Sequence, residues 1–254
     1  METKKIEELV EIARSAAGVA SRLMIDRLGD TTRYAKSDSD LLDYATATDI
    51  ECERRIRNAL EATGIPVYGE EGGGADPSQG WCWIVDPIDG TKNWTAGLSF
   101  CGVSIGLAHD GKPIAGVVDL PFHQEQFWGI VGVGAWCDGY PIEVHDAPLR
   151  DAMIAYDMGA DVDARIVGNI RSRIGRIRML GSTAAELAWC AAGRMSAVLS
   201  PTTHSWDVAG GVAIVVAAGG VTRRLNGDPA LVTDSDIVTG APTTVADIIT
   251  LLSE

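Results

Sequence analysis

Residues 81–94 read WCWIVDPIDGTKNW and join an apolar run to two closely spaced aspartates. Trp81–Val85 is apolar enough to predict a buried strand, and Asp86 and Asp89 follow it with no basic residue before Lys92. Two carboxylates that close would repel each other if both were buried. We therefore expect a positive partner from outside this segment to hold them.

Other carboxylates stand at similar junctions. Glu70 and Glu71 follow the short apolar run that ends at Gly69, and Asp207 follows Trp206 where a helix is predicted to begin. Side chains at strand ends and helix starts can converge on one site without disturbing the core. Carboxylates with few His or Cys residues nearby indicate Mg²⁺ or Mn²⁺ rather than zinc. Each motif alone has an ordinary structural explanation, as a turn, a solvated pair or a helix cap, so only the three together predict a metal site.

The same loop has features of a phosphate site. Pro87 restricts the backbone, so that Asp86 and Asp89 can face one point while the Ile88 carbonyl stays available as a further ligand. Gly90 and Thr91 begin what is predicted as a short helix, where unpaired N–H groups attract phosphate. Metal ligands beside a phosphate cradle are typical of metal-assisted phosphoester hydrolysis.

Composition excludes several classes of protein. The chain has 254 residues, 46% of them hydrophobic, and a formal net charge of −14. Such an acidic chain lacks the basic stripe that nucleic acids require. Its five scattered cysteines fit neither a disulfide framework nor a zinc site. The N-terminus lacks an apolar signal region, and the run 208–221 is shorter than the roughly 20 residues of a membrane span, so we expect a soluble, cytoplasmic protein with no membrane partner.

Hydrophobic periodicity predicts two regions, residues 1–148 and residues 149–254. The first is expected to hold helices over 4–28 and from Asp49 to Gly64, packed on an antiparallel sheet with turns at Asp110-Gly111 and Asp138-Gly139. The second alternates strands and helices, which is typical of an α/β layer. Its elements are predicted at 152–156, 161–173, 176–180, 182–193, 195–200, 206–220, 221–225 and 243–254.

Taken together, the motifs resemble those of the inositol monophosphatase family, in particular its bacterial, actinobacterial-type branch. The match follows the family's order and spacing over nearly the whole chain. It is carried by DYATATD (43–49), GEE (69–71), WIVDPIDGTKNW (83–94) with Trp81, GSTAAELAWCAAGR (181–194), WDVAGG (206–211) and AAGG (217–220).

This resemblance implies a five-layered α-β-α-β-α sandwich of the inositol monophosphatase and fructose-1,6-bisphosphatase type. It further implies a homodimer that hydrolyses small phosphate monoesters with Mg²⁺, commonly with lithium sensitivity. Two or three ions are expected, and Mn²⁺ can substitute.

The resemblance also implies roles for individual residues. Glu70, Asp86 and the Ile88 carbonyl match the ligands of a first metal, whereas Asp86, Asp89 and Asp207 match those of a second. A third, weaker ion lies near Glu70 in the family. The catalytic residues are then Glu70 with Thr91 and Asp49, the last two as the pair that orients and deprotonates the attacking water. Lys36 matches a loop lysine near the metals in some members, the alternative being a solvated surface lysine.

Substrate contacts are expected from the phosphate loop and from two later segments, and the set is Asp89, Gly90, Thr91, Gly181, Ser182, Ser200 and Asp207, with His204 as a further possibility. Ser200 stands where inositol phosphatases of the family carry a glutamate, and a hydroxyl binds a polyol more weakly than a carboxylate does.

Inositol 1-phosphate is the leading substrate. Histidinol phosphate, fructose 1,6-bisphosphate and nucleotide-type phosphates (adenosine bisphosphate or NADP) stay open as alternatives. A catalytically silent binding homologue is the non-enzyme alternative, against which stands the presence of all four metal-binding carboxylates.

Overall fold

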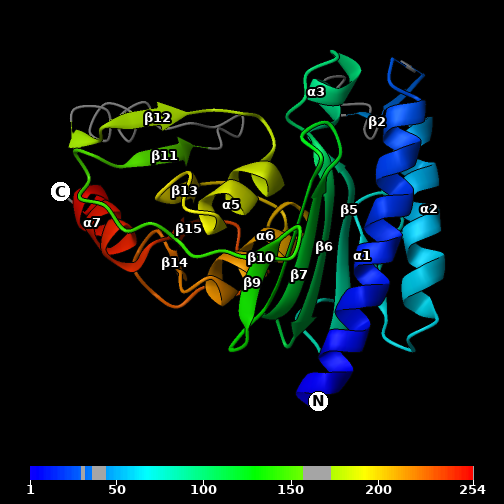
Figure 1. The fold of residues 1–254 in the computed structure, drawn as a ribbon, viewed down its shortest axis with the longest axis horizontal. Coiled ribbons are helices and arrows are strands. Elements are labelled where there is room, and N and C mark those ends of the chain that lie inside the picture. Colours follow the sequence, from blue (N-terminus) through cyan, green and yellow to red (C-terminus); the bar gives the residue numbers. More distant parts are fainter. Residues whose placement is uncertain (30–31, 36–43, 157–172, 254) are drawn as a thin grey trace.

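The structure, a computed structural model, describes residues 1–29, 32–35, 44–156 and 173–253. Five layers lie side by side (Figure 1). Helices α1 (Thr3–Asp26) and α2 (Ala47–Glu61) form the first layer and an eight-stranded sheet the second. Helices α5 (Thr183–Ala191) and α6 (Ser205–Ala217) form the third, a five-stranded sheet the fourth, and α7 (Pro242–Leu252) the fifth. The predicted sandwich is confirmed, whereas the helix expected at 161–173 lies outside the described residues except for Arg173.

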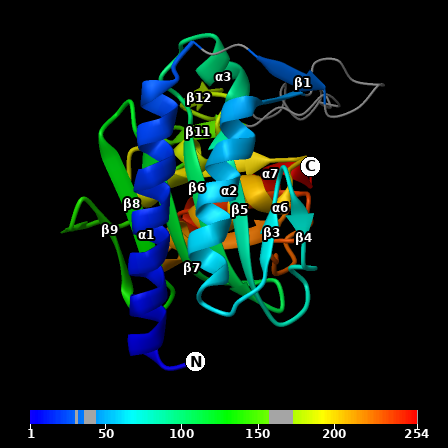
Figure 2. The ribbon, with the colours of Figure 1, turned by 90° about the vertical axis from the view of Figure 1, so that its right-hand side faces the viewer.

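The eight-stranded sheet is antiparallel, as predicted, except where β3 pairs with β5 in parallel. The expected turns occur at Asp110 and Asp138, both with positive φ. Helices α1 and α2 cross its outer face (Figure 2). In spatial order its strands are β10 (Tyr140–Pro141), β9 (Gly134–Cys137), β8 (Glu125–Ile130), β7 (Lys112–Leu120), β6 (Gly102–His109), β5 (Trp81–Asp89), β3 (Val67–Gly69) and β4 (Gly73–Gly74). A separate pair joins β1 (Arg33–Ala35) to β2 (Tyr44–Thr46).

Strand β5 is longer than the sequence indicates. It was expected to end at Val85, but it continues through both aspartates to Asp89, with a register shift between Asp86 and Asp89. Pro87 has no N–H to donate to the sheet, and the Ile88 N–H bonds instead to Asp86 Oδ1 at 3.0 Å. This irregularity at the strand end brings both carboxylates to the same end of the sheet.

The five-stranded sheet is mixed rather than built from a regular strand–helix alternation. Its order is β12 (Arg176–Arg178), β11 (Met153–Tyr156), β13 (Ala197–Ser200), β15 (Ile237–Gly240) and β14 (Val221–Arg224). The first three strands run parallel, whereas β15 is antiparallel to both of its neighbours. Strand β15 was not predicted, because a run of only four residues between turns, IVTG, carries no periodicity that distinguishes a strand from a loop.

Helix α6 approaches the eight-stranded sheet unusually closely. A Cβ atom at Gly116 of β7 would overlap the backbone carbonyl oxygen of Gly210 in α6, and one at Gly210 would lie 2.7 Å from Ser104 Oγ. Because glycine has no side chain, these two positions let the backbone of α6 contact the strands directly. The contact fixes the start of α6, and with it Asp207, relative to the sheet that carries Asp86.

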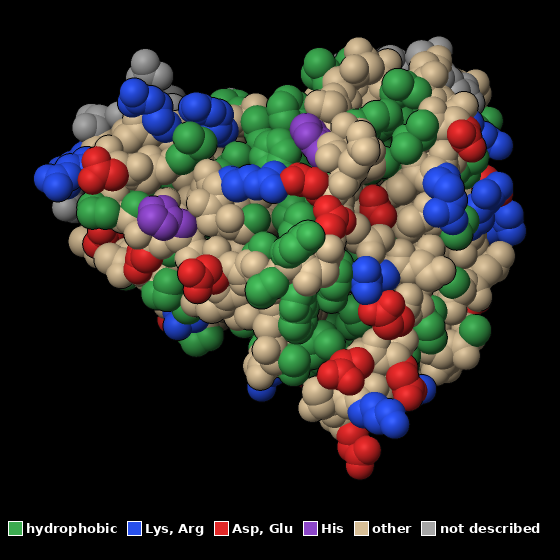
Figure 3. Space-filling view, in the orientation of Figure 1, with side chains coloured by type: hydrophobic (Ala, Val, Ile, Leu, Met, Phe, Trp, Pro, Cys, Tyr) green, Lys and Arg blue, Asp and Glu red, His purple; other side chains and the backbone are tan. Residues whose placement is uncertain are grey.

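The two predicted regions share one interior, because α6 belongs to the second region by sequence and packs on strands of the first. Their division at residue 148 stays a prediction. Hydrophobic side chains gather down the middle of the face in Figure 3, with several acidic and basic side chains next to them and others toward the edges. Within the described ranges, no helix is long and apolar enough to cross a bilayer.

We predict that Gly116→Ala lowers the free energy of unfolding by about 1–3 kcal/mol, because the added methyl group overpacks the contact with α6. Gly18→Ala is the matched control, since a Cβ there meets its nearest neighbour, Arg22, at 3.7 Å. In mid-helix this control should gain about 0.5–1 kcal/mol. Urea unfolding of both variants measures the difference, and equal effects would contradict the close packing.

Candidate active site

Three carboxylates from two distant segments converge at the end of β5. Asp86 and Asp89 come from the irregular strand end, and Asp207 comes from the first turn of α6. One carboxylate oxygen from each of the three residues lies within 4.8 Å of the other two. Asp86 is only 2% exposed and Asp89 only 7%. Buried carboxylates at this separation need a cation or a proton between them.

The pKa of Asp86 reflects the electrostatic repulsion in this arrangement. Burial raises the pKa of Asp86 well above its ordinary value, and repulsion by Glu70, Asp89 and Asp207 raises the pKa further. A divalent cation would relieve both effects, because it stabilises the charged carboxylates. The ligands are oxygen atoms only, which suits Mg²⁺ or Mn²⁺. The residues present therefore fit the metal that the sequence predicts.

These carboxylates line a cavity of about 180 Å³. Tyr44 and Lys92 are in its wall but were not predicted as site residues. The sequence signal that could have identified Lys92 as a site residue was its position as the first basic residue after the two aspartates. The full lining is Tyr44, Glu70, Asp86, Ile88, Asp89, Gly90, Thr91, Lys92, Gly181 and Asp207.

Glu70 reaches the cavity from the turn after β3. Its N–H donates to the Val85 carbonyl at 3.1 Å, so its backbone is tied to the residue before Asp86. The Glu70 side chain is close enough to raise the pKa of Asp86 by repulsion and hydrogen bonding. Glu70 is therefore placed to share a cation with Asp86.

Asp49 and Thr91 form a hydrogen-bonded pair beside the cluster. Thr91 Oγ1 lies 3.0 Å from Asp49 Oδ1 and 2.9 Å from the Ile88 carbonyl oxygen. Asp49 is fully buried and also accepts bonds from the N–H and hydroxyl of Thr46, which caps α2. Burial raises the pKa of Asp49, although the hydrogen bonds from Thr46 and Thr91 oppose the shift. Asp49 thus completes the capping box of α2 with Thr46 and holds the Thr91 hydroxyl in place.

Gly90 turns the chain from β5 into the short helix α3 (Thr91–Thr95). Its φ of +82° lies in the left-handed region. A Cβ atom there would lie 2.8 Å from the Phe100 carbonyl oxygen and 3.1 Å from that of Gly181. Only glycine fits both the conformation and the space.

Asp89 links the cavity to the start of α5. Its Oδ2 accepts a bond from the Ala184 N–H at 2.7 Å and another from the Ser182 hydroxyl. Nearby, Asn93 Nδ2 lies 2.7 Å from the carbonyl oxygens of both Phe100 and Leu180. These bonds hold the start of α5 beside the cavity, where Gly181 is part of the lining and the buried Ser182 lies behind it. The bridging role of Asn93 was not predicted.

Ser200 and His204 are not among the residues that line the cavity. Ser200 ends β13 and is buried, 1% exposed. His204 is exposed, stacks on Trp206 with ring centroids 4.7 Å apart, and donates its backbone N–H to Asp207 Oδ2 at 2.9 Å. Lys36 lies outside the described residues.

A model of the inositol monophosphatase family matches residues 5–254. The chain belongs to the inositol monophosphatase family. Its members are phosphoric monoester hydrolases that generally depend on Mg²⁺. The predicted reaction class is thereby confirmed, and an inositol phosphatase is favoured over the alternative substrates.

Curated members of the inositol monophosphatase family resemble this chain over most of their length. The inositol-1-monophosphatase ImpA of Mycolicibacterium smegmatis is 39% identical, over 79% of this chain and 76% of its own. The probable inositol 1-monophosphatase ImpA of Mycobacterium tuberculosis is 35% identical, over 97% of this chain and 94% of its own.

Solved structures show the same fold. The suhB protein of Bartonella henselae superposes with a TM-score of 0.89 at 27% identity, covering 97% of this chain and 99% of its own. An SaIMPase-II structure with bound inositol monophosphate superposes with a TM-score of 0.81 at 27% identity, covering 96% and 92%.

We predict that Asp86→Asn lowers Mg²⁺-dependent phosphate release by about a hundredfold or more, because Asp86 is central to the carboxylate cluster. In chelator, the same variant should unfold at an equal or higher urea concentration than wild type, because a repelled buried charge is gone. Near-normal activity in the variant would contradict the assignment of Asp86 as a ligand.

Proposed function

We propose that this protein hydrolyses an inositol phosphate monoester, with inositol 1-phosphate as the leading substrate, to inositol and inorganic phosphate. The observation that carries the proposal is the convergence of Asp86, Asp89 and Asp207 within 4.8 Å in a cavity that also contains Lys92. The proposal is supported by similarity to curated inositol-1-monophosphatases and to a structure that contains inositol monophosphate.

Two metal positions are proposed. Glu70, Asp86 and the Ile88 carbonyl would hold one ion, whereas Asp86, Asp89 and Asp207 would hold the other, with a third, weaker ion near Glu70. Bound there, Mg²⁺ or a substituting Mn²⁺ would offset the phosphate charge and lower the pKa of a water molecule. Asp86 serves both positions, which agrees with its burial and with the three carboxylates that raise its pKa.

The protein's own contribution to proton transfer is assigned to Asp49 and Thr91. The Thr91 hydroxyl accepts a proton from the attacking water and passes its own proton to Asp49 Oδ1, 3.0 Å away. Burial raises the pKa of Asp49, which improves it as a proton acceptor. Thr46 prevents Asp49 from turning away by bonding its other oxygen.

Substrate contacts are proposed on two sides. The backbone of Gly90 and Thr91 would hold the phosphate, with Asp89 and Asp207 adjoining it, whereas Gly181 and Ser182 would face the alcohol. Ser200 would replace the family glutamate and His204 would contribute at the rim, although both lie outside the cavity lining. Weaker recognition of the polyol at Ser200 implies a broader substrate range.

Four further properties are proposed: a homodimer and lithium sensitivity, which the family resemblance implies, and a cytoplasmic location and a chain division at residue 148, which the sequence pattern predicts. Light scattering tests the oligomeric state. The apolar side chains in the middle of the face drawn in Figure 3 support association of two copies.

A substrate panel tests the function. Released phosphate is measured for inositol 1-phosphate, histidinol phosphate, fructose 1,6-bisphosphate, adenosine bisphosphate and NADP, each with Mg²⁺ and with EDTA. We expect the highest kcat/KM for inositol 1-phosphate and no turnover in EDTA. A preference for another ester would overturn the substrate assignment, and no metal-dependent release from any ester would favour the catalytically silent alternative.

We further predict that Thr91→Val lowers kcat by about a hundredfold to ten-thousandfold, because the variant keeps the side-chain shape but removes the hydroxyl bonded to Asp49. Thr91→Ser is the matched control and should retain most activity. Binding of Mn²⁺ should be preserved in both. A kcat of Thr91→Val close to that of Thr91→Ser would exclude the proton relay.

A further inference from the structure

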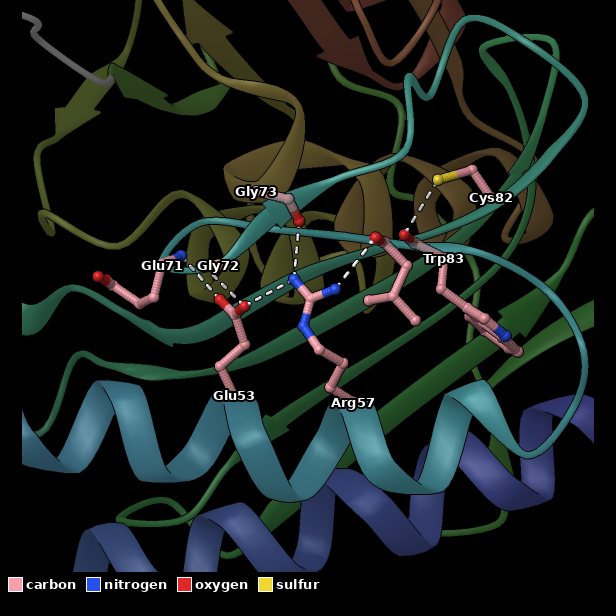
Figure 4. Close-up of polar contacts among 8 residues, drawn as sticks. Glu53, Arg57, Glu71, Gly72, Gly73, Cys82 and Trp83 are labelled. Carbon is pink, nitrogen blue, oxygen red and sulfur yellow. Dashed lines mark hydrogen bonds and ion pairs between the residues drawn. The ribbon is translucent and has the colours of Figure 1, made fainter.

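Glu53, which is buried, and Arg57, which is half-buried, lie one turn apart on α2 beneath the backbone of Glu71 and Gly72 (Figure 4). Glu70 is the residue before Glu71 in the same turn. Neither Glu53 nor Arg57 takes part in the chemistry described above. Glu53 is only 3% exposed, and a carboxylate that deeply buried must be fully paired to be tolerated.

The Glu53 carboxylate is bonded to the backbone of the Glu70 turn. Its Oε2 accepts the Glu71 N–H at 2.7 Å, and its Oε1 accepts the Gly72 N–H at 2.9 Å. The preceding N–H, that of Glu70, donates to the Val85 carbonyl of β5 at 3.1 Å. Three consecutive amides of the turn are therefore fixed, one by the strand that carries Asp86 and two by Glu53.

Arg57 completes the contact. Its Nη2 lies 2.8 Å from Glu53 Oε1 and 2.7 Å from the Gly73 carbonyl oxygen, and its Nη1 lies 3.2 Å from the Val67 carbonyl oxygen. The guanidinium thus neutralises Glu53 and joins the two strands on either side of the turn, β3 and β4.

The turn has no room to shift toward α2. A Cβ atom would lie 2.5 Å from the Glu53 carboxylate at Gly69, and 2.7 Å from Glu53 Oε1 at Gly72. The two glycines allow the carboxylate to sit directly against the backbone. A surface salt bridge on the same helix, from Glu51 to Arg54 and Arg55, makes no such contact with the turn.

We propose that Glu53, supported by Arg57, is a positioning residue that holds Glu70 toward Asp86 and so sets the affinity of the site for a divalent cation. The inference rests on the proposed role of Glu70 as a metal ligand. Without the cation, repulsion between Glu70 and Asp86 pushes the turn outward, and the Glu53 bonds oppose that movement. Ligands held in place before binding need no reordering when the ion arrives.

The test is Mn²⁺ binding to the metal-free protein, measured by calorimetry and by electron paramagnetic resonance. Glu53→Gln keeps the side-chain volume but replaces one acceptor oxygen with a donor facing a backbone N–H. We expect its Kd for Mn²⁺ to rise at least about tenfold. Glu51→Gln is the matched control, since it removes the same charge from the same helix, and its Kd should stay within about twofold of wild type.

Activity distinguishes positioning from general destabilisation. If Glu53 acts through metal affinity, the variant's turnover should return toward the wild-type value at high Mg²⁺ concentration, with KM for the substrate little changed. Folding is checked by near-ultraviolet circular dichroism at low temperature. A reduced turnover that high Mg²⁺ does not restore would overturn the proposal.

Gly72→Ala reaches the same contact from the turn, because its methyl group displaces the Glu53 carboxylate and removes no charge. It should weaken Mn²⁺ binding as Glu53→Gln does. In wild type, the Glu71 and Gly72 amides should exchange slowly with deuterium even in chelator. Fast exchange, or Mn²⁺ affinity in Glu53→Gln equal to that of Glu51→Gln, would exclude the proposal.

The Glu70→Gln variant tests the proposed ligand role of Glu70 separately from the proposed positioning role of Glu53. If it weakens Mn²⁺ binding while Glu53→Gln does not, Glu70 is a ligand and Glu53 is not its positioning residue. If Glu70→Gln has no effect on Mn²⁺ binding, the proposed ligand assignment fails.

Discussion

Repulsion among buried carboxylates is the constraint on which the active site depends. Asp86, Asp89 and Asp207 lie within 4.8 Å of one another although burial and mutual repulsion both oppose their charges. The surrounding fold holds them there by bonds to fixed groups: the Ile88 N–H to Asp86, the start of α5 to Asp89, and the His204 N–H to Asp207. A divalent cation bound at the proposed site would find these carboxylates already assembled, with the fold supplying the free energy that keeps them together.

Close packing between the layers fixes the positions of these carboxylates relative to one another. Helix α6 lies close against β6 and β7, because Gly116 and Gly210 meet backbone to backbone. A helix held at that distance cannot slide without steric overlap. Asp207 therefore inherits its position from a contact in the middle of the helix, one that involves no charged group.

The sequence predicted best those site residues that belong to a recognisable short motif. Glu70, Asp86, Asp89 and Asp207 were predicted as site residues because three acidic motifs stand together at strand ends and a helix start, and Thr91 because it begins a short helix beside them. Strand β15 and the extension of β5 were missed, since pairing with distant neighbours decides them rather than local periodicity. Glu53 could not be distinguished from Glu51 by sequence, because only the folded turn shows which carboxylate it meets.

Asp89 makes the first turn of α5 part of the charge balance of the cavity. Its Oδ2 accepts the Ala184 N–H and the Ser182 hydroxyl, while the same carboxylate belongs to the acidic cluster. A group in the cavity that draws electron density from the Asp89 carboxylate weakens the hydrogen bonds that Asp89 accepts from α5. Conversely, stronger hydrogen bonds from α5 reduce the negative charge that Asp89 presents to the cavity. Occupancy of the cavity and the stability of the central helical layer are by this route linked reciprocally.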